Sequence, residues 1–68
     1  MRSFYTNNIG LTADLCLFLD GTHTRLTVRN PDGEAFIREV YPTWDAALNV
    51  LRSISGCWTN VLTHQPLN

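Results

Sequence analysis

The sequence predicts a small α+β domain, an antiparallel β-meander of three or four strands with one amphipathic α-helix packed on one face. Two turn signals support this prediction, because Asp20-Gly21 and the Asn-Pro-Asp-Gly segment at residues 30–33 each separate stretches of β-type sequence. A third observation is the apolar stripe at helical spacing that follows Thr43. The 68 residues predict a single domain, residues 1–68, with flexible ends over 1–3 and 64–68.

The N-terminal half predicts the first hairpin. A short strand at residues 4–6 and a turn at residues 7–10 precede a segment, residues 11–20, in which apolar and polar residues alternate. With Asp20-Gly21 as a two-residue loop, the apolar residues of the two strands pair on one face. The expected pairs on that face are Leu19 with Thr22, Leu17 with Thr24, Leu15 with Leu26 and Ala13 with Val28, and those on the opposite face are Phe18 with His23, Cys16 with Arg25 and Asp14 with Thr27.

The third strand of the meander follows the turn at residues 30–33. A type I turn closed by a glycine bulge pairs Val28 with Phe36, and this register directs Phe36 and Val40 toward the core. The residues then expected to face outward are Ile37, Glu39 and Tyr41. A slip of one residue inverts the two sets, and both sets contain apolar residues.

The helix is predicted from Thr43 onward. Threonine is a favoured N-cap, and Asp45 lies in the first turn, where the helix dipole favours an acid. The apolar stripe consists of Trp44, Ala47, Leu48, Val50, Leu51 and Ile54. Gly56 predicts the C-terminal cap, and residues 58–63 predict a fourth strand or a return segment.

Composition and charge narrow the classes of function. The formal net charge of -1 provides no overall attraction for nucleic acid or an anionic membrane, and all five basic residues are arginine. No signal peptide is visible, and the longest apolar stretch, residues 15–19, is too short to span a bilayer. Two cysteines without a secretory signal predict free thiols and a cytoplasmic protein, in the host cytoplasm if a phage encodes it.

No motif in the sequence predicts catalysis. Cys16, His23, Cys57 and His64 are the ligand types that zinc prefers, but no two of them are spaced as in zinc fingers. Asp14 and His23 lie near Cys16 on one face of the predicted hairpin, where a flat sheet provides no pocket for a nucleophile. We therefore expect no enzyme activity, no metal site and no cofactor.

The outward sheet face is the candidate partner-binding surface. Its aromatic and apolar residues, surrounded by arginines, have the composition of protein interfaces. The predicted contact residues are Phe18, His23, Arg25, Arg29, Ile37, Arg38 and Tyr41. Three alternatives remain open: a nucleic-acid platform, a homodimer through this face, and a face covered by the chain's own ends.

Two resemblances extend this interpretation. In its size, its single compact α+β unit and its lack of a catalytic motif, the chain resembles small phage-encoded inhibitors, including anti-CRISPR proteins. Residues 15–54, with three strands leading to the helix at Thr43, resemble the HicB-like antitoxin domain, although its proline- and glycine-containing segment before the helix is absent. The first resemblance implies a non-catalytic inhibitor that sterically blocks a bacterial complex such as a CRISPR effector, and the second implies an antitoxin-like regulator.

Overall fold

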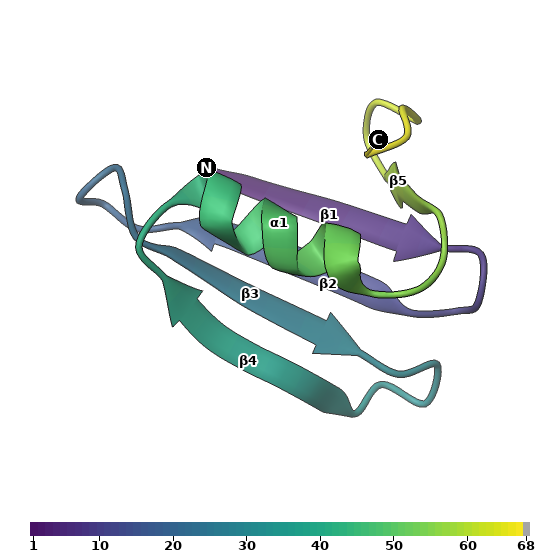
Figure 1. Ribbon diagram of the computed structural model, residues 1–68. Helices are drawn as coiled ribbons and strands as arrows, with labels where there is room; N and C mark the ends of the chain where they lie inside the picture. The colour runs from purple at the N-terminus through teal and green to yellow at the C-terminus, as the bar shows by residue number, and fades with distance from the viewer. Residues whose placement is uncertain (68) are drawn as a thin grey trace.

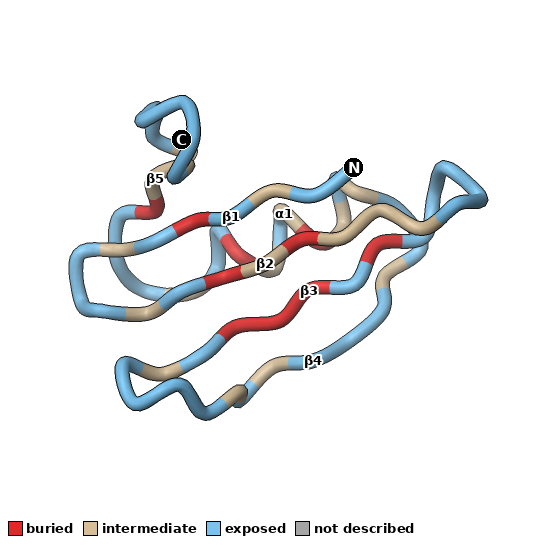
Figure 2. The backbone as a smooth tube through the Cα atoms, turned by 180° about the vertical axis from the view of Figure 1, so that it is seen from behind, coloured by how far each residue is buried: buried red, intermediate tan, exposed pale blue. Residues whose placement is uncertain are grey.

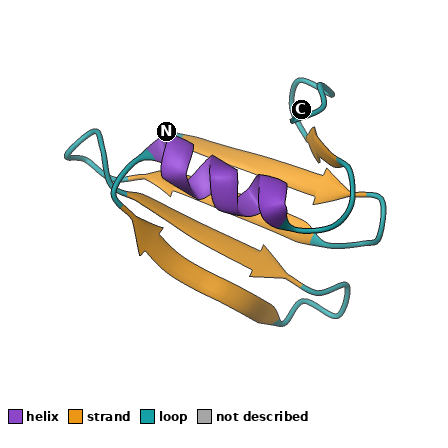
Figure 3. Ribbon diagram, viewed as in Figure 1, coloured by secondary structure: helices purple, strands orange, loops and turns teal. Residues whose placement is uncertain are grey.

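The computed structural model describes residues 1–67, which fold as one antiparallel sheet with a helix on one face (Figures 1 and 3). Along the chain the elements are β1 (Arg2–Asn7), β2 (Thr12–Leu17), β3 (Thr24–Arg29), β4 (Ala35–Tyr41), α1 (Trp44–Ser53) and β5 (Trp58–Asn60). The strand order β4-β3-β2-β1-β5 confirms the predicted α+β meander, and β5 returns to pair with β1 as a fifth strand. Asn68, part of the predicted flexible end, lies outside the described residues.

The β2–β3 hairpin has the predicted register. Leu17 pairs with Thr24, Leu15 with Leu26 and Ala13 with Val28. At the turn, Gly21 has a φ of +79°, and Oδ1 of Asp20 accepts hydrogen bonds from the backbone N–H groups of Thr22 and His23. The expected pair of Leu19 with Thr22 is wrong, because Gly21 N–H donates to the Phe18 carbonyl and Leu19 is fully exposed in a loop longer than two residues. The register of the strands is nevertheless the predicted one, so the same residues face the helix.

The predicted register of β4 is wrong by one residue. The turn closes as expected, because Asn30 N–H donates to the Glu34 carbonyl and Gly33 has a φ of +91°. Between Val28 and Arg29, however, the ladder contains a bulge, so that Val28 pairs with Ile37 and not with Phe36. Phe36 is the extra residue of the bulge. Because this residue shifts the alternation of β4 by one position, Ile37 and Tyr41 face the helix.

The core lies between the sheet and α1. Figure 2 shows the buried residues concentrated along β2 and β3. The fully buried side chains of Leu15, Leu26 and Val28 pack with Ala47 and Leu51 of the helix, which confirms the predicted apolar stripe. The Thr43 hydroxyl caps the helix by accepting from Ala46 N–H at 3.0 Å.

The C-terminal end of the helix differs from the prediction. The helix ends at Ser53 with Ile54 as its cap, so Gly56 is not the capping residue. Gly56 instead lies where a Cβ would come within 2.8 Å of Nδ2 of Asn7. The nearby side chain of Asn8 accepts from Cys57 N–H at 2.9 Å. Glycine is needed here because the connection to β5 passes closely over the β1–β2 turn.

Candidate binding face

The sheet has one face away from α1, which we call the outer face (Figure 2). Cross-strand pairing places its residues in three rows. The rows are Arg2, Cys16, Arg25 and Val40; Phe4, Asp14, Thr27 and Arg38; and Thr6, Thr12, Arg29 and Ala35. Neither end of the chain lies across this face in residues 1–67, because the N-terminus forms β1 and the C-terminal segment pairs with β5.

Charge on the outer face is strongly one-sided. Four of the five arginines in the chain belong to its rows, whereas Asp14 is the only acid there. The other five acids lie in the hairpin turns, on the helix side of β4 or in the helix: Asp20, Asp32, Glu34, Glu39 and Asp45. A chain with a net charge of -1 therefore presents one positively charged surface.

The single acid of the outer face is paired. Arg2 donates to Asp14 through two nitrogens, with Nε to Oδ1 at 3.1 Å and Nη2 to Oδ2 at 2.7 Å. The hydrogen bonds and the charge of Asp14 raise the pKa of Arg2 above its ordinary value. Asp14 thus occupies Arg2 and leaves the other three arginines of this face without a carboxylate partner in the described part of the chain.

Aromatic rings on the outer face lie beneath guanidinium groups. The Cζ atom of Arg2 is 5.3 Å from the centre of the Phe4 ring, and that of Arg25 is 5.5 Å from the centre of the Phe18 ring. Such cation–π contacts restrict the arginine side chains and cover part of each ring. Phe4 nevertheless remains 43% exposed. Val40, an apolar residue of the same face, is 48% exposed.

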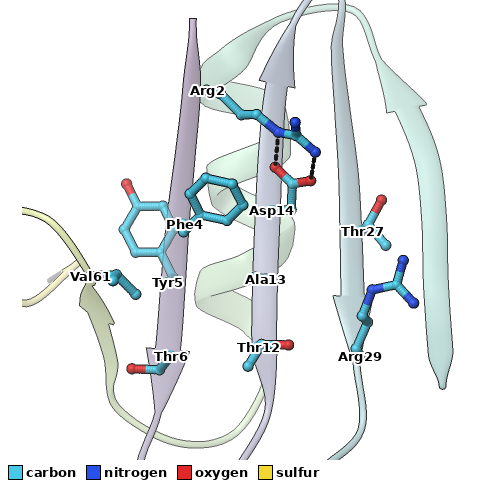
Figure 4. Close-up of a pocket in the computed structure, with 10 residues that line it drawn as sticks. All are labelled: Arg2, Phe4, Tyr5, Thr6, Thr12, Ala13, Asp14, Thr27, Arg29 and Val61. Atoms are coloured by element: carbon cyan, nitrogen blue, oxygen red, sulfur yellow. Dashed lines mark hydrogen bonds and ion pairs between the residues drawn. The ribbon is translucent and has the colours of Figure 1, made fainter. Parts of the chain in front are cut away.

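An open groove of about 460 Å³ crosses the outer face beside β1. Figure 4 shows Phe4 and Val61 on one side of it and Arg29 on the other. Thr6, Thr12 and Thr27 line it between these walls. Arg29 is itself held in place, because Nη1 donates to the Gly33 carbonyl at 3.0 Å. The groove combines hydroxyl groups, the guanidinium of Arg29, the Arg2–Asp14 ion pair and apolar walls, a lining suited to binding a side chain of a partner.

Of the seven predicted contact residues, four lie on the outer face, two do not, and His23 lies at its margin. Phe18, Arg25 and Arg29 lie on the outer face as expected. Arg38 also lies there, but because of the bulge in β4 and not because of the predicted register. The placement of Ile37 and Tyr41 on this face is wrong, because the bulge in β4 turns both toward the helix, where they pack against the core. The sequence interpretation missed Arg2, Phe4, Val40 and Val61. An N-terminal strand taken from Arg2 and the correct β4 register would have indicated the first three.

His23 lies at the end of the β2–β3 hairpin, where its ring contacts its own turn. Nδ1 of His23 lies 2.5 Å from Oδ2 of Asp20. Hydrogen bonds from the Thr22 backbone, the His23 ring and the His23 backbone lower the pKa of Asp20. The side chain of His23 thus supports the turn and lies at the margin of the outer face, not among its rows.

Other functional features are few. Residues 1–67 contain no group of three or more His, Cys, Asp and Glu side chains arranged to hold a metal ion. Both cysteines are free thiols, with Cys16 half-buried and Cys57 exposed. The helix α1, in the part of the chain that the structure describes, is too short to cross a membrane.

Comparison of the chain with protein-family models, curated proteins and solved structures finds no match.

Proposed function

We propose that the protein is a non-catalytic binding module that holds an acidic surface of a partner protein on its outer face. The separation of charge carries this proposal, because four of the five arginines lie on one face and five of the six acids lie off it. Arginine and aromatic side chains are enriched at protein interfaces, and they include many of the residues that dominate binding energy.

Two kinds of contact would hold such a partner. Arg25, Arg29 and Arg38 have no carboxylate partner within residues 1–67, so each can grip an acidic side chain at two points. Phe4, Val40 and Val61 are each more than 40% exposed and would supply apolar contact between these charges. A surface that offers both favours a folded acidic protein over a simple polyanion.

A single-stranded nucleic acid is the main competing partner, and two observations count against it. The rings of Phe4 and Phe18 lie beneath guanidinium groups, so bases would have to displace arginines in order to stack. Asp14 also occupies Arg2, so three guanidinium groups of this face remain to neutralise a phosphate backbone, whose binding depends on many such contacts.

The narrower hypothesis concerns the identity of the partner. As a phage or mobile-element inhibitor, the protein would cover a working surface of a larger bacterial complex, such as a CRISPR effector, and act by steric occlusion. An outer face with free arginines and exposed apolar side chains suits that mode of action, since it needs contact and no chemistry.

Single charge reversals test the proposal. The variants Arg25→Glu and Arg38→Glu change the outer face, and Arg52→Glu changes the one arginine on the helix by the same amount of charge. Each tagged variant is used to capture partners from bacterial lysate treated with nuclease. The affinity of any stoichiometric partner is then measured with the purified pair.

We expect the first two variants to weaken binding about tenfold or more, with Arg52→Glu close to the unchanged protein. All three should keep the circular dichroism spectrum of the unchanged protein, since these arginines are exposed. Equal effects at Arg25, Arg38 and Arg52 would contradict the proposed face. A partner that disappears on nuclease treatment would favour the nucleic-acid alternative.

A further inference from the structure

The two edges of the sheet end in different ways. At one edge, β5 is covered by the chain's own C-terminal segment: Asn60 N–H donates to the Gln65 carbonyl and Leu67 N–H donates to the Trp58 carbonyl, both at 2.9 Å. At the other edge, β4 pairs with β3 alone, and no segment of residues 1–67 covers its free side (Figure 1). The open edge is also the longer one, with seven residues against three.

The free edge has an unusual composition for an exposed strand. Phe36 and Val40 are 47% and 48% exposed, and no proline lies within the strand. Uncovered edges with apolar side chains readily accept another strand, whereas charges and bulges limit which strands can pair. Arg38, Glu39 and the bulge at Phe36 therefore restrict this edge to particular partners and registers.

We propose that two copies of this chain pair through the free edges of β4, in antiparallel orientation, to form one continuous sheet of two protomers. A twofold axis perpendicular to the sheet is the only symmetry that relates two such edges in antiparallel orientation. It keeps both helices on the same side and closes the assembly as a dimer. Under this symmetry, residues directly opposite each other across the axis face the same side of the sheet.

The charges on β4 select one register. If Arg38 lies opposite its own copy, two guanidinium groups meet, and if Glu39 does so, two carboxylates meet; both arrangements are unfavourable. A register centred on Phe36 places the bulge itself at the axis, and one centred on Val40 pairs residues 39–41 and brings no arginine opposite a phenylalanine. With Ile37 at the axis, residues 36–38 of both copies pair, and no like charges are opposed. The ladder stops there because the bulge puts Ala35 on the outer face, whereas Glu39 lies on the helix side.

The register centred on Ile37 also creates favourable contacts. Phe36 of each copy lies opposite Arg38 of the other, so the interface contains two new arginine–phenylalanine pairs. The protein already uses this pairing twice within one chain, at Arg2 with Phe4 and at Arg25 with Phe18. Ile37 would meet its own copy on the helix side, where it already packs against the core.

The dimer would join the two outer faces side by side. Because the ladder is short, the interface is smaller than a standard protein interface, and we expect a dissociation constant on the order of micromolar or weaker. Arg38 and Val40 belong to both surfaces, but this inference does not depend on the proposed function, because it concerns pairing between strand edges and not the binding of an acidic partner.

Sedimentation equilibrium of the purified protein tests the inference. From low micromolar to millimolar concentration, the average mass should rise from 7.7 kDa toward twice that value. Arg38→Gln should weaken the dimer about fivefold or more, because both cation–π pairs are lost. Glu39→Gln is the matched control and should change the dissociation constant little, since Glu39 lies outside the paired residues 36–38 in this register.

A second measurement shows whether the twofold axis of the dimer passes at Ile37. In a mixture of isotope-labelled and unlabelled chains, the Ile37 methyl groups should show a nuclear Overhauser effect between protomers. A protein that stays monomeric at millimolar concentration overturns the inference, as does a dimer without this contact. Tighter association of Arg38→Gln overturns the register, because it indicates that two Arg38 side chains were opposed. A dimer broken by Arg2→Gln and unaffected by Arg38→Gln overturns the edge in favour of the outer face.

Discussion

The two faces of the sheet are built from alternate residues of the same strands, yet they differ sharply in chemistry. On the helix side, Ala13, Leu15, Leu26 and Val28 are at most 4% exposed. On the outer side, neighbours of these residues include Asp14, Arg25 and Arg29, and the aspartate is paired with Arg2. One face is therefore committed to burial, and the other keeps its side chains available for contact.

The difference shows what each face contributes. A domain of this size has an expected free energy of unfolding of about 3–10 kcal/mol, and nearly all of its apolar burial lies on the helix side. Surface ion pairs such as Arg2–Asp14 add little to that total. The outer face can therefore vary in sequence without loss of the fold, and this freedom is what a binding surface needs.

The largest expected effect comes from opening a cavity on the helix side. Leu51→Ala removes a fully buried side chain of α1 and should lower the free energy of unfolding by about 2–5 kcal/mol, enough to unfold much of the protein. Phe4→Ala on the outer face should lower it by about 1 kcal/mol or less, because Phe4 is 43% exposed. Urea denaturation of both variants measures the difference. Equal losses would mean that the outer face also belongs to the core.

The next largest effect tests the register of β4. Ile37→Ser places a hydroxyl against the core and should lower the free energy of unfolding by about 1–3 kcal/mol. Phe36→Ser changes a residue that is 47% exposed and should cost about 0.5 kcal/mol. Urea denaturation of the two variants, run side by side, gives the order. A larger loss in Phe36→Ser than in Ile37→Ser would mean that Phe36 faces the core, as in the register without the bulge.

The two hairpins explain why the sequence predicts one register and not the other. In β2 and β3, apolar residues alternate with polar ones, so only one register buries Leu15, Leu26 and Val28 together. In β4, Phe36 and Val40 on one side match Ile37 and Tyr41 on the other in apolar character. The hydrophobic pattern therefore favours neither register. The bulge at Phe36 decides between them, and no glycine in the sequence marks its position.

The sequence predicts a residue of the candidate site correctly where it predicts the register of that residue's strand correctly. Arg25 lies on a strand of unambiguous register, and its position follows directly from the alternation. Phe4 was missed because β1 has no regular alternation of its own and takes its place through pairing with β2. Long-range pairing of this kind has no signature within a short stretch of sequence.

A smaller effect is expected from the ion pair of the outer face. Arg2→Ala, Asp14→Asn and the double variant form a cycle whose coupling should be weakly favourable and should fall as salt is added, because Arg2 is 60% exposed. Thermal or urea unfolding at low and high salt measures this coupling. A coupling as large as the loss in Ile37→Ser would show that the outer face contributes to stability as strongly as the helix side.

The smallest effect concerns the turn that sets the faces of β2 and β3. Hydrogen bonds from Thr22 and His23 lower the pKa of Asp20, so the folded state favours its carboxylate more than the unfolded state does. That contribution is present above the ordinary pKa of an aspartate, about 4, and is lost as the pH falls through the lower pKa of the folded state. Asp20→Asn should therefore reduce the loss of stability between neutral pH and about pH 2, with the fold unchanged.

Urea unfolding of the unchanged protein and of Asp20→Asn at both pH values measures this difference. Asp32→Asn in the other hairpin is the matched control, since its carboxylate also accepts a backbone N–H within its own turn, from Glu34. If Asp32→Asn changed the pH dependence as much as Asp20→Asn does, the contacts of His23 would have no special role. A specific effect at Asp20 would instead show that its acid-sensitive loop helps to hold the alternation that separates the buried face of the sheet from its charged one.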